Sequence, residues 1–385
     1  MLKTIKTFLS AIVDLYHQFQ PEKNRPDYGF AFMIHPRSLI DVYRIFPLFK
    51  FIPNWLSNFL IAHFWPVTIS KITGLKTEKG EAISGWVISI PLTAQQMLAK
   101  RELALNYIIE ACHLAQNKGA KIIGLGALTS SLCKGGLDLI DKVDIAVTTG
   151  HSYTAYNVTQ TVLKIMADLD SWAQDSVLAI VGASGSIGSA SAKILAKHNF
   201  REIILIDVER KKDKLQELAD QIKEKNNDTN LSLSHQVGDV IRADFIITAT
   251  NTPEALVRAR DLKTGAIIID DAQPSDVAMD VYDRNDVLVL AAGAVHTPKI
   301  TTNFNLGLQN RYDNFCCLAE VLILASEKRD KHYTISQTND ILIEELATKG
   351  QQLGFVVANY QNIKEIVPEE KILHLKKLKA KNTWA

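Results

Sequence analysis

Segments with the apolar pattern of β-strands alternate along this chain with segments whose apolar residues have helical spacing. Between residues 67 and 92, β-branched runs flank a charged, glycine-containing turn and predict two strands. Residues 94–117 repeat apolar positions at intervals of three and four and end at Lys118-Gly119, which is typical of a helix and its stop signal. A strand-like run follows from Lys121, so this part of the chain predicts an α/β domain.

Beyond a long predicted helix, residues 152–169, the apolar runs become nearly continuous and as short as strands. They are separated by stretches of helix length and cover residues 177–181, 202–208, 243–250, 265–272 and 286–293. Buried parallel strands have this pattern. The fold class predicted for the chain is therefore α/β, with a doubly wound Rossmann-type parallel sheet, an N-terminal α/β substrate domain and C-terminal helices.

These changes of pattern predict four segments. An apolar helical extension is followed by an α/β substrate domain with its linking helix, a dinucleotide-binding Rossmann domain, and a C-terminal helical region that carries two adjacent cysteines and ends in a basic tail. Their predicted bounds are 1–65, 66–172, 173–300 and 301–385. The lysine-rich tail is interpreted as solvated, with docking of an acidic carrier as the alternative.

The extension is unusually apolar. Residues 1–19 predict an amphipathic helix, whereas residues 45–65 are dense in aromatic side chains but broken by Pro47, Lys50 and Pro53, which argues against a spanning helix. Two interpretations stay open for the broken stretch. It forms a pair of short core helices, or it forms an apolar lid that receives an acyl chain or touches a membrane surface.

Composition narrows the classes of partner. With 43 basic and 42 acidic side chains the chain has no global basic field, so nucleic acid is not an expected partner. Four cysteines are too few and too scattered for a disulfide framework, which favours a cytoplasmic location, with peripheral membrane contact left open. No compact cluster of metal ligands is visible, and a homo-oligomer is left open.

Residues 181–190, VGASGSIGSA, carry a variant of the dinucleotide fingerprint between a predicted strand and a predicted helix. The first glycine permits a tight turn, the second a close approach to pyrophosphate, and the third close packing of helix on sheet. The helix start adds N–H groups and a positive dipole end. The cofactor-binding residues predicted for this turn are Gly182, Ser184, Gly185, Ser186, Ile187 and Gly188.

The choice between NADH and NADPH stays open at the end of the next strand. Asp207 stands where a carboxylate accepts hydrogen bonds from both ribose hydroxyls and so favours NAD. Arg210 and the two lysines after it are able to hold a 2′-phosphate instead, or simply to begin an exposed helix. We therefore predict NADPH or NADH as the cofactor, bound in part by Asp207 and Arg210.

A second candidate site follows the Rossmann segment. Cys316 and Cys317 lie on a predicted apolar helix, where one thiol is expected to face the core and the other a cleft. A thiolate suits a nicotinamide enzyme that acts on acyl groups, because it takes over a thioester and hydride then releases an aldehyde. The turn at residues 148–151 is expected to supply oxyanion donors near Thr149, and His151, with His35 and His296, a proton donor.

Several separated segments together resemble the long-chain acyl-acyl-carrier-protein reductases, which form fatty aldehydes. The resemblance runs in the family's order through residues 67–74, 125–131, 148–156, 182–190, 315–320 and 348–355. It implies that the cysteine of the F-x-C-x-A-E segment, Cys317, carries the acyl group. It also implies an acyl thioester of carrier protein or coenzyme A as substrate.

Two features depart from that family. Its members normally use NADPH and have a basic residue near the position of Asp207, and residues 1–64 fit its pattern poorly. The polar pair His35 and Arg37 is interpreted as a turn or surface pair, with a phosphopantetheine contact as the alternative. The competing functions are a cysteine-independent dehydrogenase of a small alcohol or ketone, similar to shikimate dehydrogenase, and a non-catalytic NAD(P)-binding protein.

Overall fold

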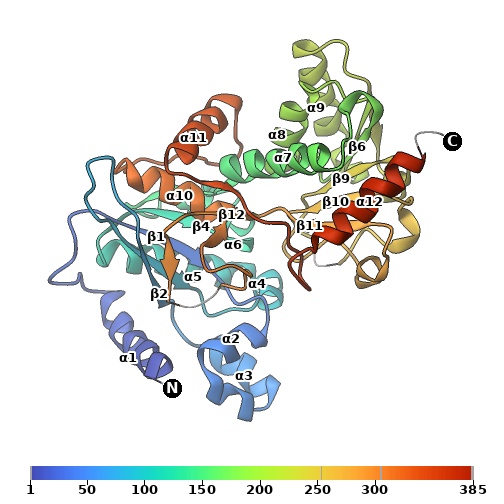
Figure 1. Ribbon diagram of the computed structural model, residues 1–385. Helices are drawn as coiled ribbons and strands as arrows, with labels where there is room; N and C mark the ends of the chain where they lie inside the picture. Colours follow the sequence, from blue (N-terminus) through green and yellow to red (C-terminus); the bar gives the residue numbers. More distant parts are fainter. Residues whose placement is uncertain (1, 253, 304–305, 383–385) are drawn as a thin grey trace. The chain divides into compact units, whose positions relative to one another are not determined.

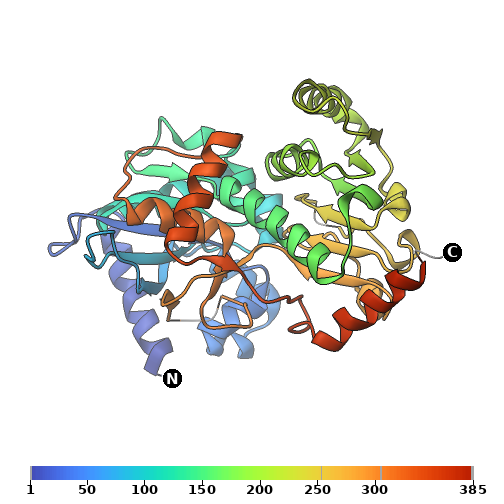
Figure 2. The same ribbon diagram turned by 45° about the horizontal axis from the view of Figure 1, so that its top comes forward.

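The computed structural model describes residues 2–252, 254–303 and 306–382, and the chain divides into two compact units (Figures 1 and 2). Unit 1 comprises Met1–Gly150, Thr297–Gln337 and Thr348–Phe355, and unit 2 comprises His151–His296, Thr338–Ala347 and Val356–Ala385. This division differs from the four predicted segments. The extension belongs to unit 1, the predicted linking helix opens unit 2, and the C-terminal region is shared between both.

Unit 1 is built on a mixed six-stranded sheet. Its strands in spatial order are β13 (Thr301–Thr302), β2 (Val67–Thr73), β3 (Ser84–Ser89), β1 (Gly29–Ile34), β4 (Ala120–Leu125) and β5 (Ala146–Thr148). The four strands from β3 to β5 are parallel, whereas β2 and β13 run antiparallel to their neighbours. Strand β1 lies in the segment predicted to be helical, because its run of six residues is short and carries no turn signal on its N-terminal side.

Side chains alternate between the two faces of this sheet. On one face, residues such as Ala31 and Ile123 pack in a core with α5 (Arg101–Asn117). On the other, α10 (Cys316–Ser326) lies over β1 and β4, where a side chain at Gly124 would press on Val321. The helix predicted over residues 94–117 is two helices, since α4 (Ala94–Ala99) ends at Lys100, whose backbone is not helical.

A buried ion cluster fastens the first helix, α1 (Leu2–His17), to the sheet. The Asp14 carboxylate is fully buried, accepts the Thr68 N–H at 2.6 Å, and lies 3.0 Å from the Lys118 ammonium. The same ammonium lies 2.9 Å from Glu22. Two carboxylates and one cation are thus held together where α1 meets β2 and the end of α5.

We expect Lys118→Met to destabilise unit 1 by about 3–5 kcal/mol, because it leaves the buried Asp14 carboxylate without its cation. Urea unfolding monitored by circular dichroism measures the loss. Lys328→Met is the matched control, since Lys328 pairs with Glu81 at 2.6 Å on the surface, where both side chains are about half exposed. Water screens such an exposed pair, so its loss should change the free energy of unfolding little. Equal losses in the two variants would contradict the role given to the buried cluster.

Residues 39–61, which include most of the broken aromatic stretch, form α2 (Leu39–Ile45), a 3₁₀ turn (Pro47–Phe51) and α3 (Asn54–Ile61). Short helices are thus present as predicted, but α3 reaches the core with only one face, through Ser57 and Ile61. Large apolar side chains of these elements are exposed: Ile40, Leu48, Phe51, Trp55 and Phe59. In the part of the chain that the structure describes, we find no helix with the length and apolar character needed to cross a bilayer.

Unit 2 contains the predicted parallel sheet. Its order is β11 (Leu288–Ala291), β10 (Ile267–Asp270), β9 (Phe245–Thr248), β6 (Val177–Val181), β7 (Glu202–Ile206) and β8 (Leu231–Ser234), and every neighbouring pair is parallel. Read from β8, this is the 3-2-1-4-5-6 order of the Rossmann fold, whose strand order reverses between the first and fourth strands. The predicted α/β fold class with a doubly wound sheet is confirmed.

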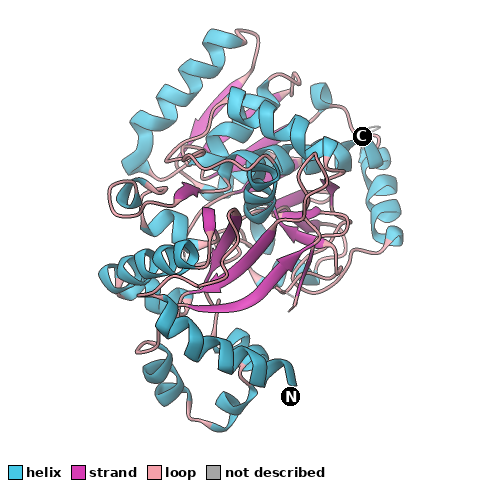
Figure 3. Cartoon of the chain, turned by 90° about the vertical axis from the view of Figure 1, so that its left-hand side faces the viewer, coloured by secondary structure: helices cyan, strands magenta, loops and turns pink. Residues whose placement is uncertain are grey.

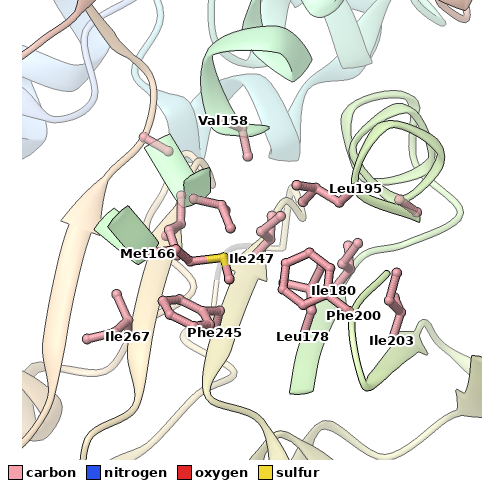
Figure 4. Close-up of a cluster of buried hydrophobic side chains, with 14 of the residues drawn as sticks. Val158, Met166, Leu178, Ile180, Leu195, Phe200, Ile203, Phe245, Ile247 and Ile267 are labelled. Atoms are coloured by element: carbon pink, nitrogen blue, oxygen red, sulfur yellow. The ribbon is translucent and has the colours of Figure 1, made fainter. Parts of the chain in front are cut away.

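Helices α7 (His151–Asp168), α8 (Ser186–Ala196) and α9 (Lys212–Lys225) bury their apolar faces on this sheet. Figure 4 shows Met166 of α7 beside Phe245 and Ile247. The predicted basic tail is instead helix α12 (Glu369–Asn382), whose Leu375 is buried in the same core. The sequence does not predict this contact, because the many lysines of α12 mask the periodic pattern of its apolar residues.

The remaining elements are short or connect the two units along the chain. They are α6 (Leu128–Leu132), β12 (Ala294–His296), β14 (Asp313–Phe315), α11 (Asp340–Gln352) and β15 (Val356–Val357). Within unit 2, β12 pairs antiparallel with β15. Before the first turn of helix α11, the Asn339 side chain accepts the Leu342 N–H at 3.0 Å.

Candidate functional site

The two cysteines occupy the first turn of α10 in unit 1. Phe315 precedes the helix, Cys316 is 1% exposed, and Cys317 is partly exposed. The predicted difference between the two thiols is thus present, with Cys316 in the core and Cys317 accessible. A helix N-terminus stabilises negative charge, so the first turn of α10 is a favourable place for a thiolate.

The turn that follows β5 lies directly against this cysteine. Gly150 has φ of +80°, and a Cβ at this position would overlap the Cα and Cβ atoms of Cys317. Only glycine combines the left-handed backbone with so close an approach. The structure therefore brings together the turn at Thr148–Gly150 and Cys317, two segments that are far apart in the sequence.

A buried glutamate, which the sequence reasoning missed, fixes this turn. Glu320 lies one helical turn beyond Cys317, is fully buried, and accepts hydrogen bonds from the Thr148 hydroxyl and, at 3.2 Å, from the Gly150 N–H. A carboxylate in so apolar a helix is costly unless such donors satisfy it. The sequence contains one sign of this role, because the final glutamate of the F-x-C-x-A-E segment is a charged residue in an otherwise apolar helix.

The backbone of the turn is already engaged. The Thr149 N–H donates to the Thr334 carbonyl at 3.0 Å, and the Gly150 N–H donates to Glu320. The prediction that N–H groups of this turn serve an oxyanion is therefore not met at these two atoms. The Thr149 side chain is 1% exposed, and its role as an oxyanion donor stays a prediction.

Burial lowers the pKa of two of the three candidate histidines, His151 and His35. His151 is the first residue of α7 in unit 2, and burial lowers its pKa to about 4, so the ring is neutral at pH 7. His35 is buried in unit 1, where Nδ1 lies 2.9 Å from the Pro36 carbonyl and Nε2 accepts the Leu128 N–H at 3.4 Å. Burial also lowers the pKa of His35. His35 thus orders a turn, and Arg37 pairs with Asp41 at the surface, as the first interpretation has it.

The glycine turn of unit 2 has the geometry that its spacing predicts. Gly182 has φ of +82°, and a Cβ there would lie 2.7 Å from the Ala249 carbonyl oxygen. Gly185 is the residue before α8, and a Cβ at Gly188 would overlap the carbonyl oxygen of Gly182. The turn therefore sits between β6 and the loop after β9, at the switch point of the sheet, where dinucleotides bind in this fold.

The start of α8 contains a polar atom suited to a phosphate. The Ser186 hydroxyl oxygen is buried and has no hydrogen-bond partner among the described residues. Ile187, the next residue, packs its side chain partly into the core. An unpaired hydroxyl beside the N–H groups of a helix start fits the pyrophosphate of a dinucleotide.

Asp207 is tied to the same turn. Its carboxylate accepts the Ser184 N–H at 3.1 Å and the Ser184 hydroxyl, and the Lys211 ammonium lies 3.3 Å away. Burial opposes ionisation, but the hydrogen bonds from Ser184 and the charge of Lys211 outweigh it and hold the pKa of Asp207 below its usual value. Arg210 is exposed in the short turn that follows.

A second feature that the sequence reasoning missed orders the loop after β9. Asp276 accepts the Thr250 hydroxyl at 2.6 Å and the Thr250 N–H at 3.1 Å, and Asp270 accepts the Thr248 hydroxyl at 2.7 Å. Burial raises the pKa of Asp276 to about 6, aided by the charge of Asp270. These carboxyls hold the segment whose carbonyl meets Gly182. Across the described ranges, no three His, Cys, Asp or Glu side chains are grouped so as to hold a metal ion.

Comparison with known families supports the cofactor class. Residues 164–295 match the model of the shikimate/quinate 5-dehydrogenase family. This span covers the Rossmann sheet, the glycine turn after β6 and the loop after β9. Together with the strand order, this match confirms the predicted class of cofactor, NAD(P)(H), and identifies unit 2 as having the fold of NAD(P)-dependent dehydrogenases and reductases.

Two proteins are similar over most of the chain. The aminotransferase PigE of Serratia sp. is 26% identical over 320 residues, which cover 81% of this chain and 36% of that protein. The long-chain acyl-[acyl-carrier-protein] reductase of Synechococcus elongatus is 25% identical over 308 residues, which cover 75% of this chain and 86% of that protein. The chain thus spans only about a third of the length of the aminotransferase.

Solved structures give weaker likenesses. The glutamyl-tRNA reductase of Methanopyrus kandleri is 17% identical, with 74% of this chain and 57% of that chain covered and a TM-score of 0.29. The nucleotide-binding domain of the Thermoplasma volcanium glutamyl-tRNA reductase is 20% identical, with 35% and 84% covered and a TM-score of 0.26. Scores this low place no constraint on what the chain does.

Proposed function

We propose that the protein reduces a long-chain acyl thioester to a fatty aldehyde, with hydride from a nicotinamide cofactor. The observation that carries the proposal is the partly exposed residue Cys317 in the first turn of α10, packed against a glycine turn that Glu320 anchors. The similarity to the acyl-carrier-protein reductase of Synechococcus elongatus covers 75% of this chain and supports the same chemistry. The family match, by contrast, is confined to the nucleotide unit and the helix that opens it.

The proposed reaction divides the work between thiol and cofactor. The Cys317 thiolate attacks the thioester carbonyl, forms an acyl-cysteine, and expels the thiolate of the carrier, which takes up a proton. The turn from Gly182 to Gly188 would hold the reduced dinucleotide, which would supply hydride to the acyl carbonyl and leave a hemithioacetal oxyanion on Cys317. Collapse of the hemithioacetal breaks the carbon–sulfur bond, gives the aldehyde, and returns Cys317 to its starting state. The Thr149 hydroxyl is the proposed donor to the oxyanion.

The carrier is acyl carrier protein or coenzyme A, because both present the acyl group as a thioester on the same phosphopantetheine arm. The test is to incubate the full-length protein with acyl thioesters of either carrier and with deuterated NADH or NADPH, and to analyse the products by mass spectrometry. The proposal expects an aldehyde that carries deuterium at C1. Dinucleotide oxidation without aldehyde, or no oxidation by any acyl thioester, would refute it.

NADH is the cofactor that Asp207 favours, because an ionised carboxylate repels the 2′-phosphate of NADPH. We expect Asp207→Asn to lower the ratio of NADH to NADPH affinity by about tenfold or more, as removal of one nearby charge implies. Fluorescence titration of each dinucleotide measures this ratio without any substrate. Asp220→Asn, an exposed carboxylate on α9, is the control and should leave the ratio unchanged. A wild-type protein that already prefers NADPH would contradict the role given to Asp207.

A further inference from the structure

An exposed apolar surface in unit 1 plays no part in the proposed reaction. It is formed by α2, the 3₁₀ turn and α3, and we call it the aromatic platform, with Ile40, Leu48, Phe51, Trp55 and Phe59 as its defining side chains. Phe51 is 86% exposed and Trp55 is 72% exposed. Five large apolar side chains exposed on neighbouring elements are unusual unless something binds to them.

The platform rests on a fixed base. On its inner side, the Asn58 carbonyl accepts the Gln96 side-chain N–H at 2.8 Å, and the Ala62 carbonyl accepts the Tyr107 hydroxyl at 2.9 Å. Ser57 and Ile61 are buried beneath α3. These hydrogen bonds fasten α3 and its C-terminal end to α4 and α5. The outer side chains are therefore presented by an ordered helix and not by a loop.

A second apolar face lies beside the platform. Helix α1, which begins at the N-terminus marked in Figures 1 and 3, lies at the same end of unit 1 as α2 and α3 in Figure 1. Trp65, just beyond α3, donates to the Ala11 carbonyl of α1 at 2.8 Å. The outer face of α1 is also apolar and exposed, through Leu9, Ile12, Val13 and Tyr16. A second exposed apolar face is therefore joined by a hydrogen bond to the segment that follows α3.

The charged residues around the platform indicate which kind of partner this surface fits. Residues 36–66 contain three cations, Arg37, Arg44 and Lys50, and one carboxylate, Asp41. Asp41 pairs with both arginines, at 2.9 and 3.3 Å, but one carboxylate balances only one of them. The segment therefore keeps a net charge of +2, and its unpaired cation Lys50 lies next to Phe51 in the sequence. An acidic carrier protein would need several available cations, whereas the most exposed groups here are aromatic. Walls of an acyl-chain cavity would be shielded from water, which Phe51 and Trp55 are not.

We propose that the aromatic platform, with the outer face of α1, binds the surface of an anionic lipid bilayer. Tryptophan and phenylalanine side chains on short helices enter the boundary between headgroups and acyl chains, and a neighbouring lysine is attracted by anionic headgroups. The surface would hold unit 1 at the bilayer without crossing it. This inference does not depend on the reductase activity, because lipid binding is measured without substrate or cofactor.

The test is co-sedimentation of the full-length protein with vesicles of phosphatidylcholine alone or mixed with phosphatidylglycerol. We expect binding to the mixed vesicles that weakens with added salt. Phe51→Ser and Trp55→Ser should each lower the partition coefficient by about tenfold, from the apolar area that each side chain contributes. Lys50→Gln should reduce binding to the mixed vesicles and leave binding to phosphatidylcholine little changed.

Trp172→Ser is the matched control, because Trp172 is a tryptophan 70% exposed in unit 2. It should bind vesicles as the wild type does, while quenching by brominated lipid should be lost only when Trp55 is removed. Failure of the wild type to bind either vesicle would overturn the proposal, and so would equal binding by the Phe51→Ser/Trp55→Ser variant. A wild-type dimer, or a complex with acyl carrier protein, that the same substitutions abolish without vesicle binding would assign the surface to a protein instead.

Discussion

Replacement of Cys317 by alanine is expected to abolish aldehyde formation, with a loss of about 10³-fold or more, because the nucleophile that accepts the acyl group is gone. The covalent acyl adduct should disappear with it. Intact-protein mass spectrometry after incubation with an acyl thioester, without reduced cofactor, detects this adduct directly. Binding of the dinucleotide to unit 2 should be unchanged, since Gly182, Ser186 and Asp207 are untouched.

The neighbouring cysteine provides the control. Cys316→Ala removes a thiol of the same helix turn, but one that is 1% exposed and lies in the core. It should lower stability modestly, by about 1 kcal/mol for a small buried side chain, and retain the acyl adduct. An adduct and normal aldehyde yield in Cys317→Ala would exclude the proposed chemistry and favour a dehydrogenase that does not use a thiol.

The two units differ in how much of their structure can be predicted from the sequence. The Rossmann sheet was predictable because each step from strand to helix repeats a local pattern, and the roles of Gly182 and Gly188 follow from spacing. Strand β8 was missed, because only two of its four residues are leucines and the pattern between α9 and β9 is mostly polar. Helix α12 was taken for a solvated tail for the same reason, since one buried face among many lysines leaves a weak periodic signal.

The candidate site in unit 1 was only partly predictable. The difference between Cys316 and Cys317 follows from their positions on one helix. The contact of Cys317 with Gly150 and the hydrogen bonds of Glu320 join segments about 170 residues apart, and no local pattern encodes such a pairing. The sequence leaves two interpretations of the platform open for a related reason, because an apolar run does not distinguish a buried helix from one that meets another surface.

Gly150→Ala is expected to damage the site through sterics alone. The added methyl group would overlap Cys317, so either the turn or the first turn of α10 must move, and φ of +80° is itself unfavourable for alanine. A displacement of about 1 Å at a reacting group costs on the order of 10²-fold in rate. We expect a loss of that size in kcat/KM, a changed rate of Cys317 alkylation by iodoacetamide, and destabilisation of several kcal/mol, of which overpacking supplies about 1–3 kcal/mol.

Gly80→Ala separates the two causes, since Gly80 has φ of +82° in the same unit and a Cβ there would meet no atom within 4 Å. It carries the backbone strain of about 1–2 kcal/mol without the overlap. The difference between the two variants in urea unfolding and in alkylation rate therefore measures the contact with Cys317. If Gly150→Ala behaves as Gly80→Ala does in both measurements, the turn does not hold the cysteine. If only the alkylation rate differs, the turn positions the thiol but contributes little to the free energy of unfolding. The hydrogen bonds to Glu320 must then change to accommodate the methyl group.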